Sequence, residues 1–179
     1  MGANPLGVVG IDTTLNITPT SGAGTFTDVT NLPYALGTVI SRGSRSTTGE
    51  RRYKLVLMED GDSVVGNLAV YTTDDNGFEI SVTNGENTAD NNQPAGLIVS
   101  IITDGNVGWI QTFGLSDVAM VTDNGVVTGE NVVPHATTDG GLDSAGANDV
   151  LGNVAGQALD ADTGTALAAG LVFLDCPKG

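Results

Sequence analysis

The sequence contains few of the residues that build catalytic, metal-binding or disulfide-bonded sites. Its 179 residues include one cysteine, Cys176, and one histidine, His135, and only 4% of the chain is aromatic. A single cysteine cannot form an intramolecular disulfide, and a single histidine excludes a metal site with several histidine ligands. Cys176 has only Lys178 nearby to activate its thiol. We therefore predict no disulfide framework, no cofactor and no metal site.

Segments that direct a chain to a membrane are missing from the sequence as well. Residues 1–10 have no basic flank and no long apolar run, so no secretory signal is visible. No apolar stretch approaches the roughly 20 residues that a membrane-spanning helix needs. We expect a soluble protein that is made in a cytoplasm.

The signatures of common enzyme sites are absent too. The sequence has no Gly-x-Ser-x-Gly nucleophile turn, no phosphate-binding loop and no dinucleotide-binding fingerprint. Asp162-Thr163-Gly164 matches the core of an aspartic protease, but Asp160-Ala161 precedes it where that family has an apolar strand. The same residues begin like a calcium loop that lacks its bidentate glutamate. We interpret them as a turn and predict no catalytic residues.

Two single residues could still suggest a site. His135 follows Pro134 and precedes a polar stretch, so we interpret it as a solvated loop residue. Trp109 lies between apolar neighbours in a predicted strand, and we interpret it as a core residue rather than a platform for a ligand. Pairs of carboxylates for glycoside hydrolysis are not excluded by counting, so a small hydrolase with an unrecognised site stays as an alternative.

What the chain does have is glycine, 26 residues of it, together with many threonines, aspartates and asparagines. This composition favours short strands joined by tight turns, and the Asp-Gly and Asn-Gly steps are typical turn formers. The clearest predicted hairpin joins residues 97–103 to 107–113, and residues 135–149 are predicted to be a long loop. The other predicted strands cover residues 36–41, 53–58, 64–71, 78–83, 118–122, 150–159 and 167–174.

The predicted fold is all-β, an antiparallel β-sandwich or small barrel with an extended N-terminal arm. We place the arm at residues 1–35 and the β-rich domain at residues 36–179. The arm is rich in turn formers and has only isolated apolar residues, so it is extended or becomes ordered against a partner. The alternative is that it forms the first strands of the domain. The isolated apolar residues of the arm are Ile11, Leu15, Ile17 and Phe26.

Charge is distributed very unevenly along this chain of net charge −15. Five of the six basic residues fall between residues 42 and 54, and the remainder of the chain carries one lysine against twenty carboxylates. An acidic body of this kind repels nucleic acid and anionic membranes. The basic residues fit an acidic protein surface better, including that of a neighbouring copy, although a solvated loop is the simpler alternative. The predicted contact residues are therefore Ile11, Leu15, Ile17, Phe26, Arg42, Arg45, Arg51, Arg52 and Lys54.

Several strand-and-turn patterns follow one another along the second part of the chain. They are Tyr53-Lys54-Leu55-Val56, Gly66-Asn67-Leu68-Ala69-Val70, Ala95-Gly96-Leu97-Ile98, Asp104-Gly105-Asn106, Gly108-Trp109-Ile110-Gln111-Thr112-Phe113-Gly114, Gly125-Val126-Val127-Thr128-Gly129-Glu130, Gly152-Asn153-Val154-Ala155-Gly156-Gln157-Ala158-Leu159 and Leu171-Val172-Phe173-Leu174. The order of these patterns is similar to that in capsid decoration proteins of tailed phages, also called cement or head-stabilisation proteins. The patterns cover about two thirds of the chain, and residues 1–50 match nothing.

The resemblance implies a structural protein of the virion that is made in the host cytoplasm and then binds the outer capsid surface. Its implied partners are the major capsid protein and neighbouring copies of itself in a homo-oligomer, with no nucleic acid and no membrane. The family has no catalytic residues to transfer. A head fibre, a tail component or a receptor-binding module of a phage virion is the alternative.

Overall fold

The computed structural model is all-β, as the sequence predicts. It describes residues 35–43, 49–60, 63–72, 77–82, 93–121, 126–135, 138–145, 153–161 and 168–176, and these contain no α-helix. None of them therefore forms a helix long and apolar enough to span a membrane. The ten strands are β1 (Val39–Gly43), β2 (Glu50–Asp60), β3 (Leu68–Tyr71), β4 (Glu79–Ser81), β5 (Pro94–Ile98), β6 (Val107–Val121), β7 (Asn131–Pro134), β8 (Leu142–Ser144), β9 (Gly156–Ala158) and β10 (Ala168–Asp175).

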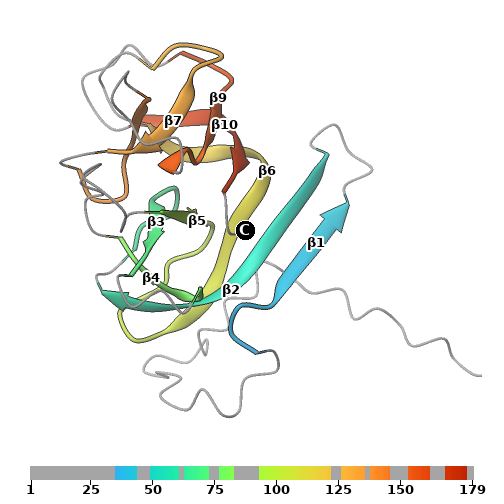
Figure 1. Ribbon diagram of the computed structural model, residues 1–179, viewed down its shortest axis with the longest axis vertical. Helices are drawn as coiled ribbons and strands as arrows, with labels where there is room; N and C mark the ends of the chain where they lie inside the picture. Colours follow the sequence, from blue (N-terminus) through green and yellow to red (C-terminus); the bar gives the residue numbers. More distant parts are fainter. Residues whose placement is uncertain are drawn as a thin grey trace, which may run out of the picture.

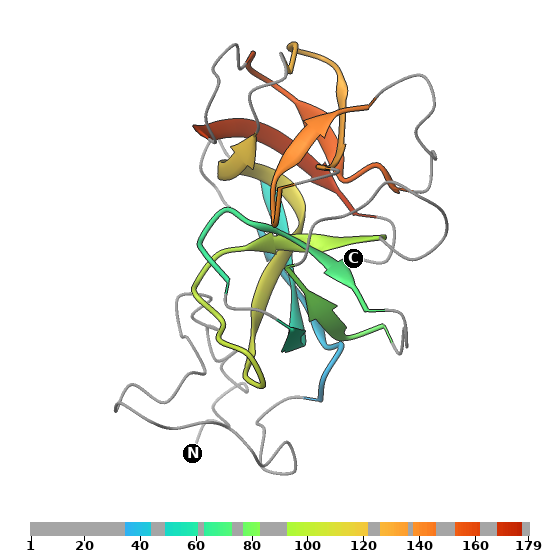
Figure 2. The same cartoon turned by 90° about the vertical axis from the view of Figure 1, so that its left-hand side faces the viewer.

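The strands close into two small barrels that share β6. They form one ten-stranded sheet in the order β1-β2-β4-β3-β5-β6-β10-β9-β7-β8, and additional pairings join β2 to β6 and β6 to β8. The first additional pairing closes a ring of β2, β4, β3, β5 and β6, and the second closes a ring of β6, β10, β9, β7 and β8. Figures 1 and 2 show β6 running from one barrel into the other. The predicted small barrel is thus present twice.

The two barrels have the same topology. Each strand of the first ring corresponds to the strand four places later in the second, so β2 corresponds to β6 and β6 to β10. Both rings contain one parallel pairing, β2 with β4 and β6 with β8, and all their other pairings are antiparallel. The described domain therefore consists of two copies of one structural unit, an internal repeat that the sequence analysis did not detect.

The turns that lead into β3 and β7 show the repeat at the level of single atoms. The backbone N–H of Asn67 donates to the carbonyl of Val64 at 3.0 Å, and that of Glu130 donates to Val127 at 3.1 Å. A second hydrogen bond runs in the opposite direction in each turn. Asn67 Oδ1 accepts from the backbone N–H of Val64, and Glu130 Oε2 accepts from that of Val127. Each turn has a glycine at its third position, with φ of 93° and 91°, values that favour glycine.

A second pair of glycines marks where strands approach closely. Gly96 of β5 and Gly156 of β9 hold the same register positions opposite β3 and β7. A Cβ atom on Gly96 would lie 2.6 Å from the carbonyl oxygen of Gln111, and one on Gly156 would lie 2.1 Å from that of Phe173. Any larger residue at these two positions would push the neighbouring strand away, so the repeat keeps glycine at both.

Side-chain alternation along β2 and β6 divides the core into separate clusters. Val56 and Met58 point into the first barrel with Ile110, whereas Leu55 and Trp109 pack on its outer side. The first barrel interior contains Val56, Met58, Ala69, Tyr71, Ile80, Val82, Ala95, Ile98, Ile102 and Ile110. The second core contains Ala119, Val126, Val132, Leu142, Ala155, Ala158, Val172, Leu174 and Cys176, joined by Leu68 and Leu97 of the first barrel.

Several strand boundaries differ from the prediction. The two strands expected at residues 107–113 and 118–122 are one 15-residue strand, β6. It bends at Gly114, where φ is 93°, and does not end there. β7 and β8 were not predicted, and β8 lies inside the expected loop of residues 135–149. Residues 64–67 form a turn, and β5 ends at Ile98. These strands were missed because short strands that pair with distant segments show little alternation of apolar and polar residues in the local sequence.

Candidate interaction site at the junction of the barrels

The structure brings some of the predicted contact residues together on the β1–β2 hairpin. Arg42 of β1 is the register partner of Arg51 of β2, and Ser41 is the partner of Arg52. Arginine thus occupies both members of one cross-strand pair, an arrangement in which like charges disfavour each other. The side chain of Arg42 lies outside the described residues, as do the whole of Ile11, Leu15, Ile17, Phe26 and Arg45.

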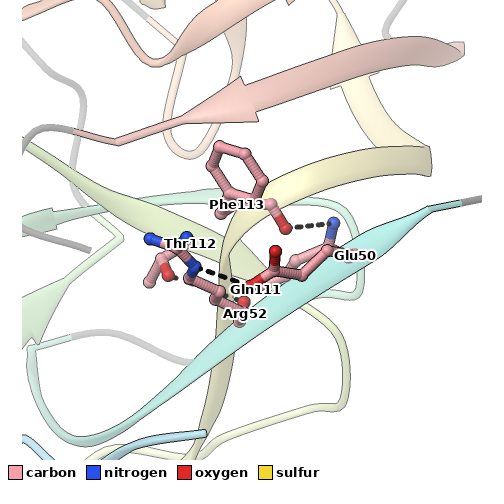
Figure 3. A network of polar contacts seen from close by, with 5 residues as sticks. All are labelled: Glu50, Arg52, Gln111, Thr112 and Phe113. Atoms are coloured by element: carbon pink, nitrogen blue, oxygen red, sulfur yellow. Dashed lines mark hydrogen bonds and ion pairs between the residues drawn. The ribbon is translucent and has the colours of Figure 1, made fainter. Parts of the chain in front are cut away.

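Arg52 is held by an ion pair and by an aromatic ring (Figure 3). Its Nε lies 3.0 Å from Oε1 of Glu50, and both side chains are close to half exposed. Its guanidinium lies 4.7 Å from the ring centroid of Phe113. The side-chain hydrogen bonds from Arg52 and Ser41, together with the Arg52 charge, lower the pKa of Glu50 below its ordinary value. Glu50 therefore stays ionised, and it orients the guanidinium over the ring.

A second phenylalanine extends this cluster across the two barrels. Phe173 of β10 packs edge-to-face against Phe113, with 5.3 Å between ring centroids and 80° between planes. Phe173 is 39% exposed, an unusual position for a large aromatic side chain. We call Glu50, Arg52, Phe113 and Phe173 the junction cluster. It joins the first strand of one ring to the last strand of the other, and strand patterns alone gave no signal for it.

The bend of β6 beneath the junction cluster is fixed by a buried amide. Gln111 is 1% exposed, and its Nε2 lies 3.1 to 3.3 Å from the carbonyl oxygens of Phe113, Gly114 and Leu115. A Cβ atom on Gly114 would lie 2.2 Å from the carbonyl oxygen of Glu50, so β2 crosses directly over this position. The bend therefore places Phe113 where both barrels meet.

Lys54 is buried, so it does not lie at a contact surface as predicted. It is 7% exposed. Its Nζ donates to the hydroxyl of Tyr71 at 2.8 Å and lies 5.0 Å from the centre of that ring. Arg51 is intermediate, with part of its side chain exposed and its buried Nε without a hydrogen-bond partner among the described residues.

His135 is buried, so the prediction of a solvated loop residue is wrong. It is 7% exposed. Its Nδ1 accepts the N–H of Thr138 at 2.9 Å, and its Nε2 lies 3.9 Å from Oδ2 of Asp143. The prediction failed because the residue follows directly on β7, a strand that the sequence analysis missed. The histidine links β7 to β8 and does not face a site.

Other residues that the sequence analysis considered as possible site residues have structural roles. Trp109 is 1% exposed, which confirms it as a core residue, and Cys176 is 5% exposed. Burial raises the pKa of the Cys176 thiol to about 12, with a smaller contribution from Asp175, so the thiol stays protonated near neutral pH. Among the described residues no three histidine, cysteine or acidic side chains gather as metal ligands. Asp160 accepts the N–H of Leu171, whereas Asp162 and Gly164 lie outside the described part.

The junction cluster has the composition of a protein-binding surface. Aromatic side chains and arginine are enriched at protein interfaces, and here Phe173 is 39% exposed and the side chain of Arg52 is 43% exposed. The ring faces and the guanidinium of Arg52 supply apolar area and hydrogen-bond donors in one place. This arrangement can bind an apolar side chain next to a carboxylate.

Comparison with known proteins gives little further information. No protein-family model matches the chain, and no curated protein matches its sequence. Among solved structures, the chain is similar to one described as "the crystal structure of head fiber gp8.5 N base in bacteriophage phi29". The TM-score is 0.44, the sequence identity is 16%, and the match covers 79% of this chain and 97% of the other. A similarity of this extent assigns neither a fold nor a function.

Proposed function

We propose that the protein is a structural component of a tailed-phage virion, where it decorates and stabilises the capsid exterior without catalysis. The ordered strand-and-turn patterns that are similar to capsid decoration proteins support this role. The observation that supports it best in three dimensions is the pair of closed barrels built on one continuous strand. Closed rings leave no unpaired strand edge within either ring, and a shared strand connects the two units directly, as suits a protein packed densely on a shell.

The β1–β2 hairpin and the junction cluster are the proposed attachment surface, together with the arm of residues 1–35. β1 lies outside both rings and carries Arg42, and β2 carries Arg51 and Arg52. The rest of the chain is strongly acidic, so neighbouring copies on a shell would repel one another unless positive surface faced that charge. The proposed partners are the major capsid protein and neighbouring copies of the chain.

The charges are expected to affect the rate of association more than the affinity. Exposed ion pairs contribute only about 0–1 kcal/mol each, and Glu50 already neutralises part of the Arg52 charge. The apolar area of Phe113 and Phe173 is better placed to supply affinity, because a buried Phe side chain contributes roughly 1.5–3 kcal/mol. The arginines then set the register and the rate of association.

Binding to undecorated capsids tests the attachment surface. Replacing Arg42, Arg45, Arg51 and Arg52 by glutamine should slow association and remove most of its salt dependence, and deleting residues 1–33 should weaken binding strongly. Arg52→Gln should slow binding more than Lys178→Gln, which removes one positive charge outside the cluster. Phe173→Ser should speed dissociation. If the quadruple glutamine variant, the deletion, Arg52→Gln and Phe173→Ser all bind like the parent, the attachment surface lies elsewhere on the molecule.

Copy number separates this proposal from its alternative. A decoration protein is expected in hundreds of copies per particle, whereas a head fibre, a tail component or a receptor-binding module is expected in few. Quantitative mass spectrometry of purified particles measures this number directly. A low copy number would refute capsid decoration and leave the wider proposal of a virion protein in place.

A further inference from the structure

Both copies of the internal repeat have an exposed valine at one equivalent position, and neither packing nor backbone conformation requires a valine there. Val64 and Val127 hold the first position of the equivalent turns before β3 and β7, and they are 56% and 52% exposed. The residues next to them in the turns differ, since Val65 corresponds to Thr128 and Asn67 to Glu130. The side chain of the first turn residue takes no part in the hydrogen bonds of the turn.

Other positions with the same residue in both barrels have evident structural reasons. The turn glycines have positive φ, the β5 and β9 glycines lie against a neighbouring strand, and the shared alanine and valine are buried in the cores. Among these pairs are Gly66 with Gly129, Gly96 with Gly156, Ala95 with Ala155 and Val70 with Val133. An exposed valine needs a different reason, and contact with another molecule is one.

Each of these valines lies in or next to a segment that is hydrogen-bonded to another segment with an exposed aliphatic side chain. In the first barrel Val65 and Ile101 are 38% and 53% exposed, and their segments are joined because Ser63 Oγ accepts the N–H of Ile102 at 2.7 Å. In the second barrel Leu159 is 38% exposed, and its segment is joined to the turn because the N–H of Gly129 donates to the carbonyl of Ala158. Both barrels thus have exposed aliphatic side chains on joined segments at their equivalent turns, and we call each of these sets a patch.

The closed rings determine how such patches can bind. Every strand of both rings is paired on two sides, so a partner cannot add a strand to them and must bind through side chains. Two patches of the same chemistry on one chain fit a partner that offers its own surface at least twice. The occupant should be apolar and should not be acidic, because this chain is strongly acidic.

We propose that the patches around Val64 and Val127 bind two copies of one partner subunit, so that the chain bridges neighbouring subunits of a repetitive shell. This inference rests on the proposed function, and it names a second surface besides the β1–β2 hairpin. Two weak contacts made at once bind far more tightly than either contact alone, by factors of about 10²–10⁴ when the geometry allows both.

Single and double variants of the two valines test the bridging. Val64→Gln, Val127→Gln and the double variant are compared with the parent for binding to undecorated shells and to isolated shell subunits. Circular dichroism and melting temperature verify that each variant stays folded. Each single variant should raise the Kd for shells by at least about tenfold. For isolated subunits, which occupy one patch at a time, each should change the Kd by no more than about twofold, whereas the double variant should weaken binding strongly.

The control is Asp117→Asn, which changes an exposed side chain of β6 that belongs neither to the two turns nor to the β1–β2 hairpin. The inference requires each turn variant to lose more shell binding than this control does. Equal binding of parent and turn variants to shells would overturn the bridging and leave the decoration role intact. A loss confined to one of the two valines would also overturn it. A parent that does not bind shells at all would overturn the proposed function as well.

Discussion

Gln111 is expected to be the residue on which the junction between the barrels depends most. We consider the change Gln111→Leu, which keeps the size of the side chain and removes its amide. The side chain is 1% exposed, and its Nε2 lies within 3.3 Å of three carbonyl oxygens of the β6 bend. Leucine would leave these oxygens without that donor in a place that water does not readily reach.

The expected cost follows from the number of donors. An amide nitrogen carries two hydrogens, so it can make two good bonds among the three carbonyls at any moment. Each such bond contributes about 0.5–1.5 kcal/mol, and buried carbonyls left unpaired add to the loss. The free energy of unfolding should therefore fall by about 2–3 kcal/mol. Gln111→Glu should cost more, because its carboxylate would face the same carbonyl oxygens.

Chemical denaturation followed by circular dichroism measures this loss. The matched control is Gln157→Leu, an exposed glutamine whose Nε2 donates to a single carbonyl, that of Gly129, at 2.8 Å. Surface changes of this kind usually alter stability by no more than about 0.5 kcal/mol. If Gln111→Leu is as mild as this control, the buried amide does not hold the bend and the reasoning is wrong.

Three further predictions follow from the described core. Trp109→Ala should lower the free energy of unfolding by about 3–5 kcal/mol, since the ring is 1% exposed, and a mild effect in denaturation curves would contradict its place in the core. Cys176 should react with alkylating reagents far more slowly in the folded than in the unfolded protein. Because its pKa is raised from 9.0 to about 12 in the folded state, its ionisation should destabilise the fold as pH rises above about 9, which melting temperatures between pH 8 and 10 would reveal. Because both barrels share β6, tryptophan fluorescence and circular dichroism should report the same unfolding midpoint, and separate midpoints would show that the barrels unfold independently.

Local chemistry made part of this protein predictable. The all-β fold follows from glycine-rich and aspartate-rich turns between short apolar runs, and the buried position of Trp109 follows from its apolar neighbours. Both depend on residues close together in the chain, where the steric preferences of turns and the alternation of strands act directly. The same local view separated the basic segment of residues 42–54 from the acidic remainder.

Only the tertiary structure decided which residues share a surface and which are enclosed. Lys54 belongs to the basic segment, yet alternation along β2 places it against Tyr71 in the interior. Phe113 and Phe173 are far apart in the chain, and they meet because β6 and β10 pair in register. The two rings are closed by pairings between distant strands, and these depend on the matching of whole faces. Such matching cannot be inferred from residues that are neighbours in the chain. The sequence by itself therefore determined the all-β fold class, whereas long-range strand pairing determined which residues form the junction cluster.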